Sequence, residues 1–428
     1  MKWRMRYLTM FVSALLLVAL SFVLWTSNQK KILRIGVYAG SSWDVPNSRE
    51  NRVLDNIIRQ FEKSYPNVKV VYESGIPKKD YDNWLAEKIL KGEQADVFMV
   101  PENDFSMLAS SGAFKSLDSL ISKEEAVAYY PVAYQAGQYQ GHSYALPIES
   151  NPVMMCVNKD LLEKEGISIP DSNWTLEDLY AICQKVTKDT DGDGLIDQYG
   201  ITDYTWKQAL VAYNGHLRNQ NGVNIDSVEM HQALSFISKL DSLNQRYKVT
   251  SNDFDEGKVA FYPMSLAQYR TYKPYPYHVA KYSRFSWTCI PMPAAKAGIP
   301  ATQVKTSLFA ISSKTKQDKL AWEFMKLLCQ NHKNQQELFA KSQGTSVLTS
   351  VVKSSQTKKI LQADDFGLDS LTSQRLDHMM KHSVLDISRD LDYHSLERLD
   401  YLLGNALKNN EIDSILPSIQ REMEETGK

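Results

Sequence analysis

Apolar and polar positions after residue 31 alternate between short apolar runs and stretches with helical spacing. Three apolar runs predict strands: ILRIGVY (32–38), VKVVY (68–72) and ADVFMV (95–100). Between them, apolar side chains at helical spacing predict a helix from about 48 to 65 and another around 81 to 90. Strand, helix, strand, helix and strand in this order predict a parallel sheet covered on both faces, so we expect an α/β fold.

The carboxyl ends of these strands mark where a ligand is expected, because ligands of parallel α/β sheets bind there. Residues 39–44, which include Trp43, follow the first strand, and residues 101–104 follow the third. These two segments are the first candidates for a binding site.

Later segments continue the mixed pattern. AGQYQGHSYALP predicts a hairpin that turns at Gln140 and Gly141, and VMMCVNKDLLEKEG predicts a buried strand followed by a helix. WTLEDLYAICQKVTKD predicts a helix capped by Thr175, with Asp178 three residues later. The remaining predicted elements are a strand at 306–313, a helix at 318–329 and a mostly helical segment at 354–425.

The first thirty residues have the pattern of an export signal. Lys2, Arg4 and Arg6 precede an apolar run of about 19 residues that ends at Trp25. This run approaches the length that spans a bilayer, no small-residue cleavage site follows it, and no cysteine is present for lipid attachment. We interpret residues 1–30 as a signal sequence or, in preference, an uncleaved membrane anchor. Either one places the rest of the chain outside the cytoplasm, held at the outer face of the membrane or secreted.

Charge and cysteine content argue against two classes of site. The formal net charge is −1 and the sequence pI is about 6.7, whereas a protein that binds a nucleic-acid backbone usually has a basic face. The four cysteines, Cys156, Cys183, Cys289 and Cys329, include no C-x-x-C pair, so we interpret them as buried thiols and not as metal ligands. Their positions leave open one long-range disulfide.

DTDGDGLIDQYG (189–200) has the spacing of a calcium loop. The candidate ligands are Asp189, Asp191, Asp193, the carbonyl of Leu195, and Asp197. The final position holds Gly200, where such a loop has a bidentate glutamate. The alternative is a loop whose aspartates cap turns and face water. Because crowded carboxylates repel one another without a cation, we keep Ca²⁺ as a candidate structural cofactor.

Other motifs have a plainer interpretation. His378 and His382 are four residues apart on a predicted helix, but neither the glutamate of H-E-x-x-H nor a third ligand accompanies them. Residues 269–287 interleave aromatic and basic side chains, which suits single-stranded nucleic acid or an acidic saccharide. A strand pair with one packed and one wet face is the simpler explanation. No nucleophile-elbow or phosphate-loop motif indicates an enzyme, although a glycosidase pair such as Glu149 with Asp104 stays open.

Five stretches, in this order, resemble the extracellular solute-binding proteins of ABC importers, in the maltose-binding-like group. They are ADVFMVPENDFSMLASSGAFKSL, HSYALPIESNPVMMCVNKDLLEKEGI, WTLEDLYAICQKVTKDTDGDGLIDQYGI, FDEGKVAFYPMS and TSLFAISSKTKQDKLAWEFMKLL. The resemblance covers most of residues 32–350. It implies a two-lobe periplasmic-binding-protein-like fold with a multi-strand hinge, a ligand cleft between the lobes, and closure on binding.

The resemblance also implies where the lobes begin and end. Lobe 1 would comprise residues 31–150 and 293–345, and lobe 2 would comprise residues 151–292 and the C-terminal helices of 346–428. The chain would cross between them near 147–153, 290–293 and 344–349.

Ligand contacts of the family carry over to the matching positions. The ends of the strands and the first crossing would supply polar sugar contacts, and aromatic side chains of lobe 2 would stack on sugar rings. The expected contacts are Trp43, Glu102, Asn103, Asp104, Glu149, Ser150, Asn151, Trp206 and Tyr269. Tyr269 stands where relatives usually have a tryptophan, so the number of stacked rings is left open.

We therefore expect an extracytoplasmic solute-binding protein, acting as a monomer, that delivers a sugar or oligosaccharide to ABC permease subunits in the membrane. No nucleic acid is expected as a partner. Two alternatives stay open: a membrane-anchored receptor that reports ligand binding to a signalling partner, and a glycoside-acting enzyme.

Overall fold

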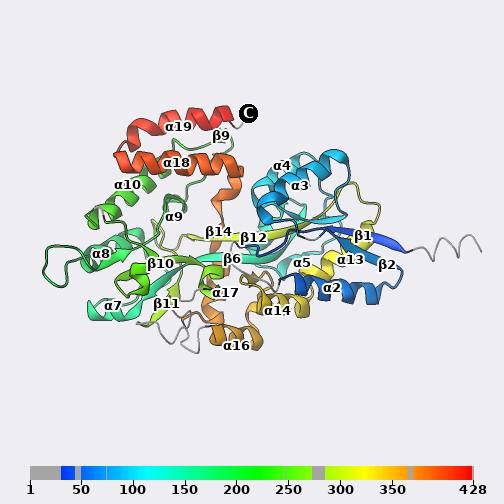
Figure 1. Cartoon of the computed structure of the whole chain (residues 1–428), viewed down its shortest axis with the longest axis horizontal. Coiled ribbons are helices and arrows are strands. Elements are labelled where there is room, and N and C mark those ends of the chain that lie inside the picture. Colours follow the sequence, from blue (N-terminus) through cyan, green and yellow to red (C-terminus); the bar gives the residue numbers. More distant parts are fainter. Residues whose placement is uncertain are drawn as a thin grey trace, which may run out of the picture.

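The structure is a computed structural model of the whole chain. It describes residues 30–43, 50–73, 75–245, 247–271, 285–364 and 370–426. The predicted signal or anchor segment and residues 272–284 of the aromatic and basic stretch lie outside these ranges. Within them, no helix is both long enough and apolar enough to cross a membrane. Two lobes lie side by side along the long axis of the molecule, with strands running between them (Figure 1).

Lobe 1 is built on the parallel strands that the sequence predicts. β1 (Lys31–Gly36) lies between β2 (Val68–Tyr72) and β3 (Val97–Val100) and is parallel to both. Its helices are α2 (Glu50–Ser64), α3 (Lys78–Lys91), α4 (Phe105–Ser110), α5 (Lys123–Val127) and α13 (Asp318–Cys329). Ile57 and Phe61 of α2 recur at helical spacing and pack with Ile35 of β1 in one hydrophobic core. The predicted strand and helix order of this lobe is confirmed.

The same sheet continues into lobe 2. Beyond β3 the order is β12 (Thr302–Ile311), β6 (Ala145–Asn158), β10 (Val259–Ser265) and β7 (Tyr199–Ile201), and β11 (Trp287–Ile290) also pairs with β6. The helices of lobe 2 are α7 (Lys159–Lys164), α8 (Leu176–Val186), α9 (Trp206–Ala212), α10 (Val228–Leu243), α11 (Ser251–Asp255), α12 (Leu266–Thr271), α18 (Tyr393–Asn409) and α19 (Ile412–Thr426). Thr175 caps α8 through the predicted capping box with Asp178. Apolar side chains of α8, α9, α10, α18 and α19 form a second core with β6 and β10.

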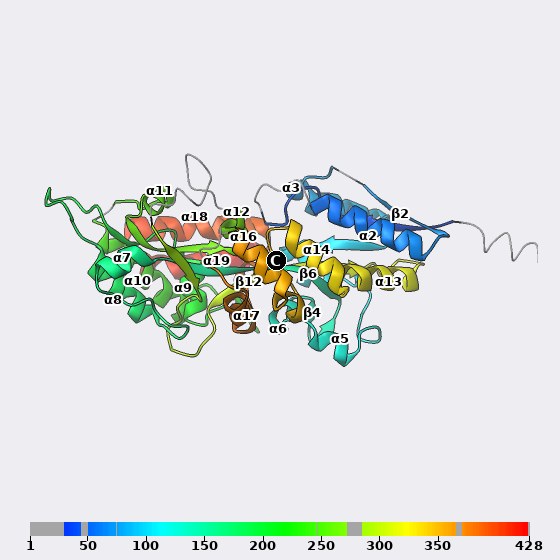
Figure 2. The ribbon, with the colours of Figure 1, turned by 90° about the horizontal axis from the view of Figure 1, so that it is seen from below.

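A third hydrophobic cluster lies where the lobes join. The helices that contribute to it are α11 and α12 of lobe 2 and also α6 (Pro131–Ala136), α14 (His332–Lys341), α15 (Thr349–Val352), α16 (Ser355–Asp364) and α17 (Ser373–Lys381). It combines Tyr129 and Tyr130, which precede α6, with Met154 of β6 and Leu376 of α17. Of the C-terminal helices that we assigned to lobe 2, α18 and α19 pack in the second core, and α15 to α17 pack in this third cluster, which also contains Phe254 of α11, Val259 of β10 and Trp287 of β11. In Figure 2, α6 and α17 lie on one side of β6 and β12, and α3 and α12 lie on the other.

Three strand segments cross between the lobes side by side. β6 lies between β12 and β13 (Thr345–Ser346) and is antiparallel to both. β6 and β13 contain residues of the segments 147–153 and 344–349, where we expect two of the crossings. The remaining crossing runs along β12, downstream of the predicted 290–293, because Met292, Ala294 and Ala301 pack in the core of lobe 2.

Candidate ligand-binding site

The loop after β3 brings three predicted site residues to the boundary between the lobes. β3 is buried along its whole length, and Glu102–Asp104 form the 3-10 turn η1 directly after Pro101. η1 packs against a second turn, η3 (Ile387–Asp390), which follows β14 (Ser383–Leu385) and precedes α18 of lobe 2. Since β14 pairs with β12 and β12 pairs with β3, the sheet holds the two turns next to each other.

Glu102 lies among charged side chains from both lobes. Lys305 of β12 and Lys78 at the start of α3 act on it from lobe 1, and Asp386 and Arg389 act on it from the β14–η3 segment. Burial is the largest effect and raises the pKa of Glu102 from 4.5 to about 7, although the three cations pull it down. Glu102 therefore exchanges its proton near neutral pH.

Asp104 is surrounded mainly by like charge. Burial, together with repulsion from Asp82 of α3 and Asp392 of lobe 2, raises the pKa of its carboxyl from 3.8 to about 6. Asp392 is the N-cap of α18, where its carboxylate accepts a hydrogen bond of 3.0 Å from the Ser395 amide. A lobe 1 carboxylate thus faces the beginning of a lobe 2 helix.

Arg389 connects the β14–η3 segment to residues of the N-terminal part of the chain. Its guanidinium donates a hydrogen bond of 3.2 Å to the Ala136 carbonyl of α6 and lies 5.5 Å from the ring centre of Phe105 in α4. The charged residues around Glu102 and Asp104 form a face between the two lobes. On one side of this face lie α3, η1 and β12, and on the other side lie η3 and the start of α18. We use the name "interlobe face" for this set below.

Glu149 lies inside the hinge. Its side chain is 3% exposed and accepts hydrogen bonds from the Gly344 amide at 2.7 Å and from the Ser342 hydroxyl, and the Trp43 indole lies beside it. Burial raises the pKa of Glu149, and these donors together with Arg270 oppose that shift. A Cβ on Gly344 would lie 2.4 Å from the Glu149 carboxylate, so only glycine fits there. Glu149 therefore connects β6 to the third crossing, and Trp43 is buried in the segment after β1.

Ser150 and Asn151 also make contacts within the hinge. The Ser150 and Thr306 hydroxyls are 2.9 Å apart and join β6 to β12. The Asn151 side-chain oxygen accepts a hydrogen bond of 2.9 Å from the Ala267 amide at the start of α12. Both side chains are buried, so they hold adjacent crossings together in this structure.

The two predicted aromatic platforms lie in hydrophobic clusters. Trp206 is 6% exposed, belongs to the lobe 2 core, and its indole N–H donates to the Asp400 carboxylate at 2.8 Å. The Lys207 ammonium lies 5.4 Å from the centre of the Trp206 ring. Tyr269 is equally buried and its ring centre is 5.4 Å from that of Trp287. The structure therefore gives neither ring an open face between the lobes.

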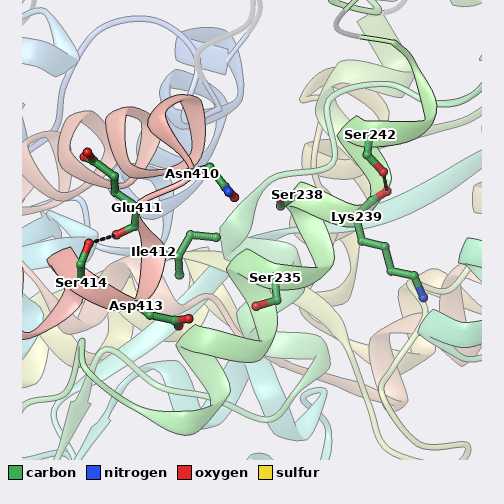
Figure 3. A pocket seen from close by; sticks show the side chains of 9 residues that line it. All are labelled: Ser235, Ser238, Lys239, Ser242, Asn410, Glu411, Ile412, Asp413 and Ser414. Atoms are coloured by element: carbon green, nitrogen blue, oxygen red, sulfur yellow. Dashed lines mark hydrogen bonds between the residues drawn. The ribbon is translucent and has the colours of Figure 1, made fainter.

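Two sizeable cavities differ in their position relative to the interlobe face. One, of about 340 Å³, borders η3 and is lined by Asp386 and Arg389, by Asn214 and His216 after α9, and by Gln135 of α6. The other, of about 530 Å³, is open to solvent and lies between α10 and the turn from α18 to α19 (Figure 3). Its lining comes from lobe 2 alone, so it does not fit a site that closes between lobes.

The aspartate loop brings three carboxylates together. Oxygen atoms of Asp189, Asp191 and Asp197 lie within 4.8 Å of one another, and this is the only group of three or more such side chains in the described part of the chain. Asp193 is not in this group and accepts a hydrogen bond of 2.8 Å from the Leu195 amide, and the three grouped aspartates also accept hydrogen bonds from backbone amides of the loop. Three of the five predicted ligands thus gather as a calcium site would need.

The histidine pair stays on a helix surface. The rings of His378 and His382 are 4.3 Å apart, and Nδ1 of His382 donates to the His378 carbonyl at 2.9 Å. Among the described residues no third side chain completes a metal site around them.

Sequence reasoning missed the partners of Glu102 and Asp104. The missed residues are Lys78, Asp82, Lys305, Asp386, Arg389 and Asp392. Lys78 and Asp82 come from α3, whereas Asp386, Arg389 and Asp392 lie up to 290 positions from η1 and reach it through the β3–β12–β14 pairing. Asp392 alone had a local signal, because Asp followed three residues later by Ser before an apolar periodic stretch resembles a helix start.

Comparison with protein families gives one match over most of the chain. The family model described as "Bacterial extracellular solute-binding protein" matches residues 56–364. Among curated proteins, the maltotriose-binding protein of Pyrococcus abyssi is 25% identical over 138 residues, which is 32% of this chain and 30% of that protein. The alignment thus spans less than a third of the relative's length.

Solved structures share the fold at low sequence identity. The sugar-binding protein MalE from Xanthomonas citri superposes with a TM-score of 0.74 at 15% identity, covering 92% of this chain and 97% of that one. An ABC substrate-binding protein from Listeria monocytogenes, solved in complex with cycloalternan, superposes with a TM-score of 0.64 at 18% identity, covering 93% and 99%. These similarities extend over both lobes.

Proposed function

Because the chain belongs to the bacterial extracellular solute-binding protein family, we propose that it binds a sugar or oligosaccharide between its lobes and delivers it to an ABC importer. The match of the family model over residues 56–364, which takes in most of both lobes and the β6 and β12 crossings, is the observation on which this rests. The proteins named above as maltotriose-binding, sugar-binding and cycloalternan-bound support saccharide as the ligand class.

The interlobe face supplies the polar groups that such a ligand needs. Carboxylates accept hydrogen bonds from sugar hydroxyls, and lysine and arginine donate to hydroxyl and ring oxygens. Glu102 and Asp104 stand on lobe 1, and Arg389 and Asp392 stand on the segment that leads into α18. A ligand that touches both sets favours the closed arrangement, since its contacts with the second lobe exist only when the lobes approach.

The hinge permits this motion without disturbing either core. Each lobe has its own hydrophobic cluster, and the crossings are short segments of β6, β12 and β13. Changes in a few backbone dihedrals at these crossings move one lobe against the other. We expect the protein to bind its ligand and release it unchanged, so prolonged incubation with an oligosaccharide should yield no shorter product.

A thermal-shift screen followed by calorimetry tests the proposal. Maltooligosaccharides and related oligosaccharides should raise the melting temperature, because a ligand bound only by the folded state stabilises it. Asp104→Asn should weaken the affinity about tenfold or more through loss of a charge-assisted hydrogen bond. The control Glu163→Gln, at an exposed site on α7, should leave it unchanged. No response to any saccharide, or full affinity in Asp104→Asn, would contradict the proposed ligand class or site respectively.

The importer partner needs a separate test in cells. Deleting the genes for the partner ABC permease subunits should abolish uptake of the ligand identified in the screen. A receptor for a signalling partner would instead leave uptake intact and lose a transcriptional response when its partner is removed.

A further inference from the structure

We propose that Cys156 and Cys289 form a disulfide bond that joins β6 to β11 in the mature protein. The two residues lie opposite each other in the antiparallel pairing of these strands. Their Sγ atoms are 3.7 Å apart, and both side chains are 0% exposed. No residue stands between the two thiols.

Backbone geometry already suits the bond. Residues directly opposite in an antiparallel pair have Cα atoms about 4.5 or 5.5 Å apart, depending on the hydrogen-bonding pattern. Both values fall within the range of roughly 4.4–6.8 Å found across disulfides. Only the side chains need to rotate about their Cα–Cβ bonds to bring the sulfur atoms from 3.7 Å to bonding distance.

The other two cysteines have no comparable neighbour. Cys183 lies on α8 in the lobe 2 core, and Cys329 lies at the end of α13 in the lobe 1 core. Cys156 and Cys289 share the third cluster at the junction. The fold therefore permits one pairing out of the several that four cysteines allow.

Oxidation of the two thiols requires an oxidising compartment, so this step rests on the extracytoplasmic location that is part of the proposed function. Disulfides persist outside the cytoplasm, where thiol–disulfide oxidants are present. One thiolate attacks a disulfide oxidant to give a mixed disulfide, and the second thiolate displaces the oxidant's remaining thiol. The two protein thiols together lose two electrons and two protons, the S–S bond forms, and the oxidant leaves as two thiols.

Burial indicates when the bond forms. It raises the pKa of the Cys156 thiol well above its ordinary value, and Cys289 next to it contributes in the same direction. A buried thiol of that kind is a poor nucleophile and is out of reach of an oxidant. The bond therefore forms while the chain folds, as β11 docks on β6, and is afterwards protected from reductants.

The bond would close a large part of lobe 2. The two cysteines are 133 positions apart, and α7 to α12, β7 and β10 lie between them. Cross-linking residues so far apart restricts the unfolded chain more than a short loop would. Within the described residues, β11 pairs only with β6, so the disulfide also fixes the last strand of lobe 2 before the chain continues toward the β12 crossing.

Alkylation and mass spectrometry test the proposal on the full chain. The protein is exported to an oxidising compartment, denatured without reductant, and treated with N-ethylmaleimide. Two alkylated cysteines are expected, against four after prior reduction, and a non-reduced digest should contain one cross-linked peptide pair with Cys156 and Cys289. Four alkylated cysteines in the unreduced protein, or a cross-link between any other pair, would overturn the proposal.

Variants add a second measurement. Cys156→Ser and Cys289→Ser should each lower the melting temperature by about 5 °C or more relative to Cys183→Ser, which controls for placing a hydroxyl in a buried site. Equal melting temperatures in the three variants would contradict the proposal. Sugar titrations of the same samples test the proposed sugar binding separately from the disulfide, because the number of free thiols does not depend on ligand binding. A sugar-binding protein with four free thiols would refute the disulfide alone.

Discussion

Replacing Glu102 by glutamine should make the protein more stable above neutral pH and have a much smaller effect near pH 5. Glu102 lies at the interlobe face, where burial raises its pKa from 4.5 to about 7. Between these values the folded state holds a proton that the unfolded state has lost. The folded state therefore loses stability as the pH rises from about 4.5 to about 7 and carries the full cost above that. Glutamine keeps the shape and the polar atoms of the side chain and never ionises.

The magnitude follows from the same pKa. A difference of one pH unit corresponds to about 1.4 kcal/mol, so moving the pKa from 4.5 to about 7 corresponds to about 3 kcal/mol as an upper limit. The side chain keeps some solvent exposure, and water screens part of this cost. We expect Glu102→Gln to raise the free energy of unfolding by about 1–3 kcal/mol at pH 8 and by about a quarter of that amount at pH 5, where the unfolded carboxyl is already mostly ionised.

Urea unfolding at both pH values, followed by circular dichroism, measures this difference. Other groups titrate over the same range, so the quantity to compare is the difference between wild type and variant at each pH. Glu163→Gln on α7, an exposed site, controls for removing one negative charge. A variant that loses stability at pH 8, or that differs from wild type equally at both pH values, would refute the argument that Glu102 bears an unfavourable buried charge.

Three further predictions follow from the other candidate residues. Trp206→Ala should lower the free energy of unfolding by about 3–5 kcal/mol in urea titrations, as a large core cavity does, while ligand affinity measured by calorimetry falls less than tenfold; a stable variant that cannot bind ligand would instead support the platform role. Ca²⁺ should raise the melting temperature of the wild type and not that of Asp191→Asn, and equal curves with and without Ca²⁺ in the wild type would count against the calcium prediction. If residues 1–25 form an uncleaved anchor, the protein should keep Met1 and sediment with membranes in high salt, and a soluble product that begins after Trp25 would exclude it.

Local patterns were sufficient to predict most elements of the fold. The period of apolar positions located β1, β2, β3 and the helices between them, and it also located α13. The capping pair Thr175 and Asp178 marked the start of α8 correctly, because both interactions lie within one turn. Residues 291–301 have no periodic pattern, so the packing of Met292, Ala294 and Ala301 in the second core, beyond the expected crossing at 290–293, depends on tertiary contacts.

The candidate site was less predictable. Glu102 and Asp104 were found because they follow a parallel strand, which is a local property. Their partners Asp386, Arg389 and Asp392 come from a distant segment that reaches η1 through strand pairing, and no local pattern reports that pairing. Trp206, Tyr269, Glu149 and their neighbours in the motif looked like contacts by resemblance. Their burial and hydrogen-bond partners depend on how the lobes are packed, which the sequence does not display.

The contrast between the hinge and the interlobe face indicates where a polar ligand has most to contribute. In the hinge, Glu149 and Asn151 are already hydrogen-bonded to the Gly344 and Ala267 amides, so a ligand would have to displace existing partners before gaining any contact. At the interlobe face, Glu102 and Asp104 are buried enough to raise their pKa values toward neutrality, which means that their ionised forms are poorly solvated. Hydroxyl groups that donate to these carboxylates would restore the lost solvation and at the same time bridge to Arg389 or to the start of α18. Ligand binding and lobe closure would then be driven by the same interaction, because the groups that gain most from the ligand stand on the surfaces that must come together.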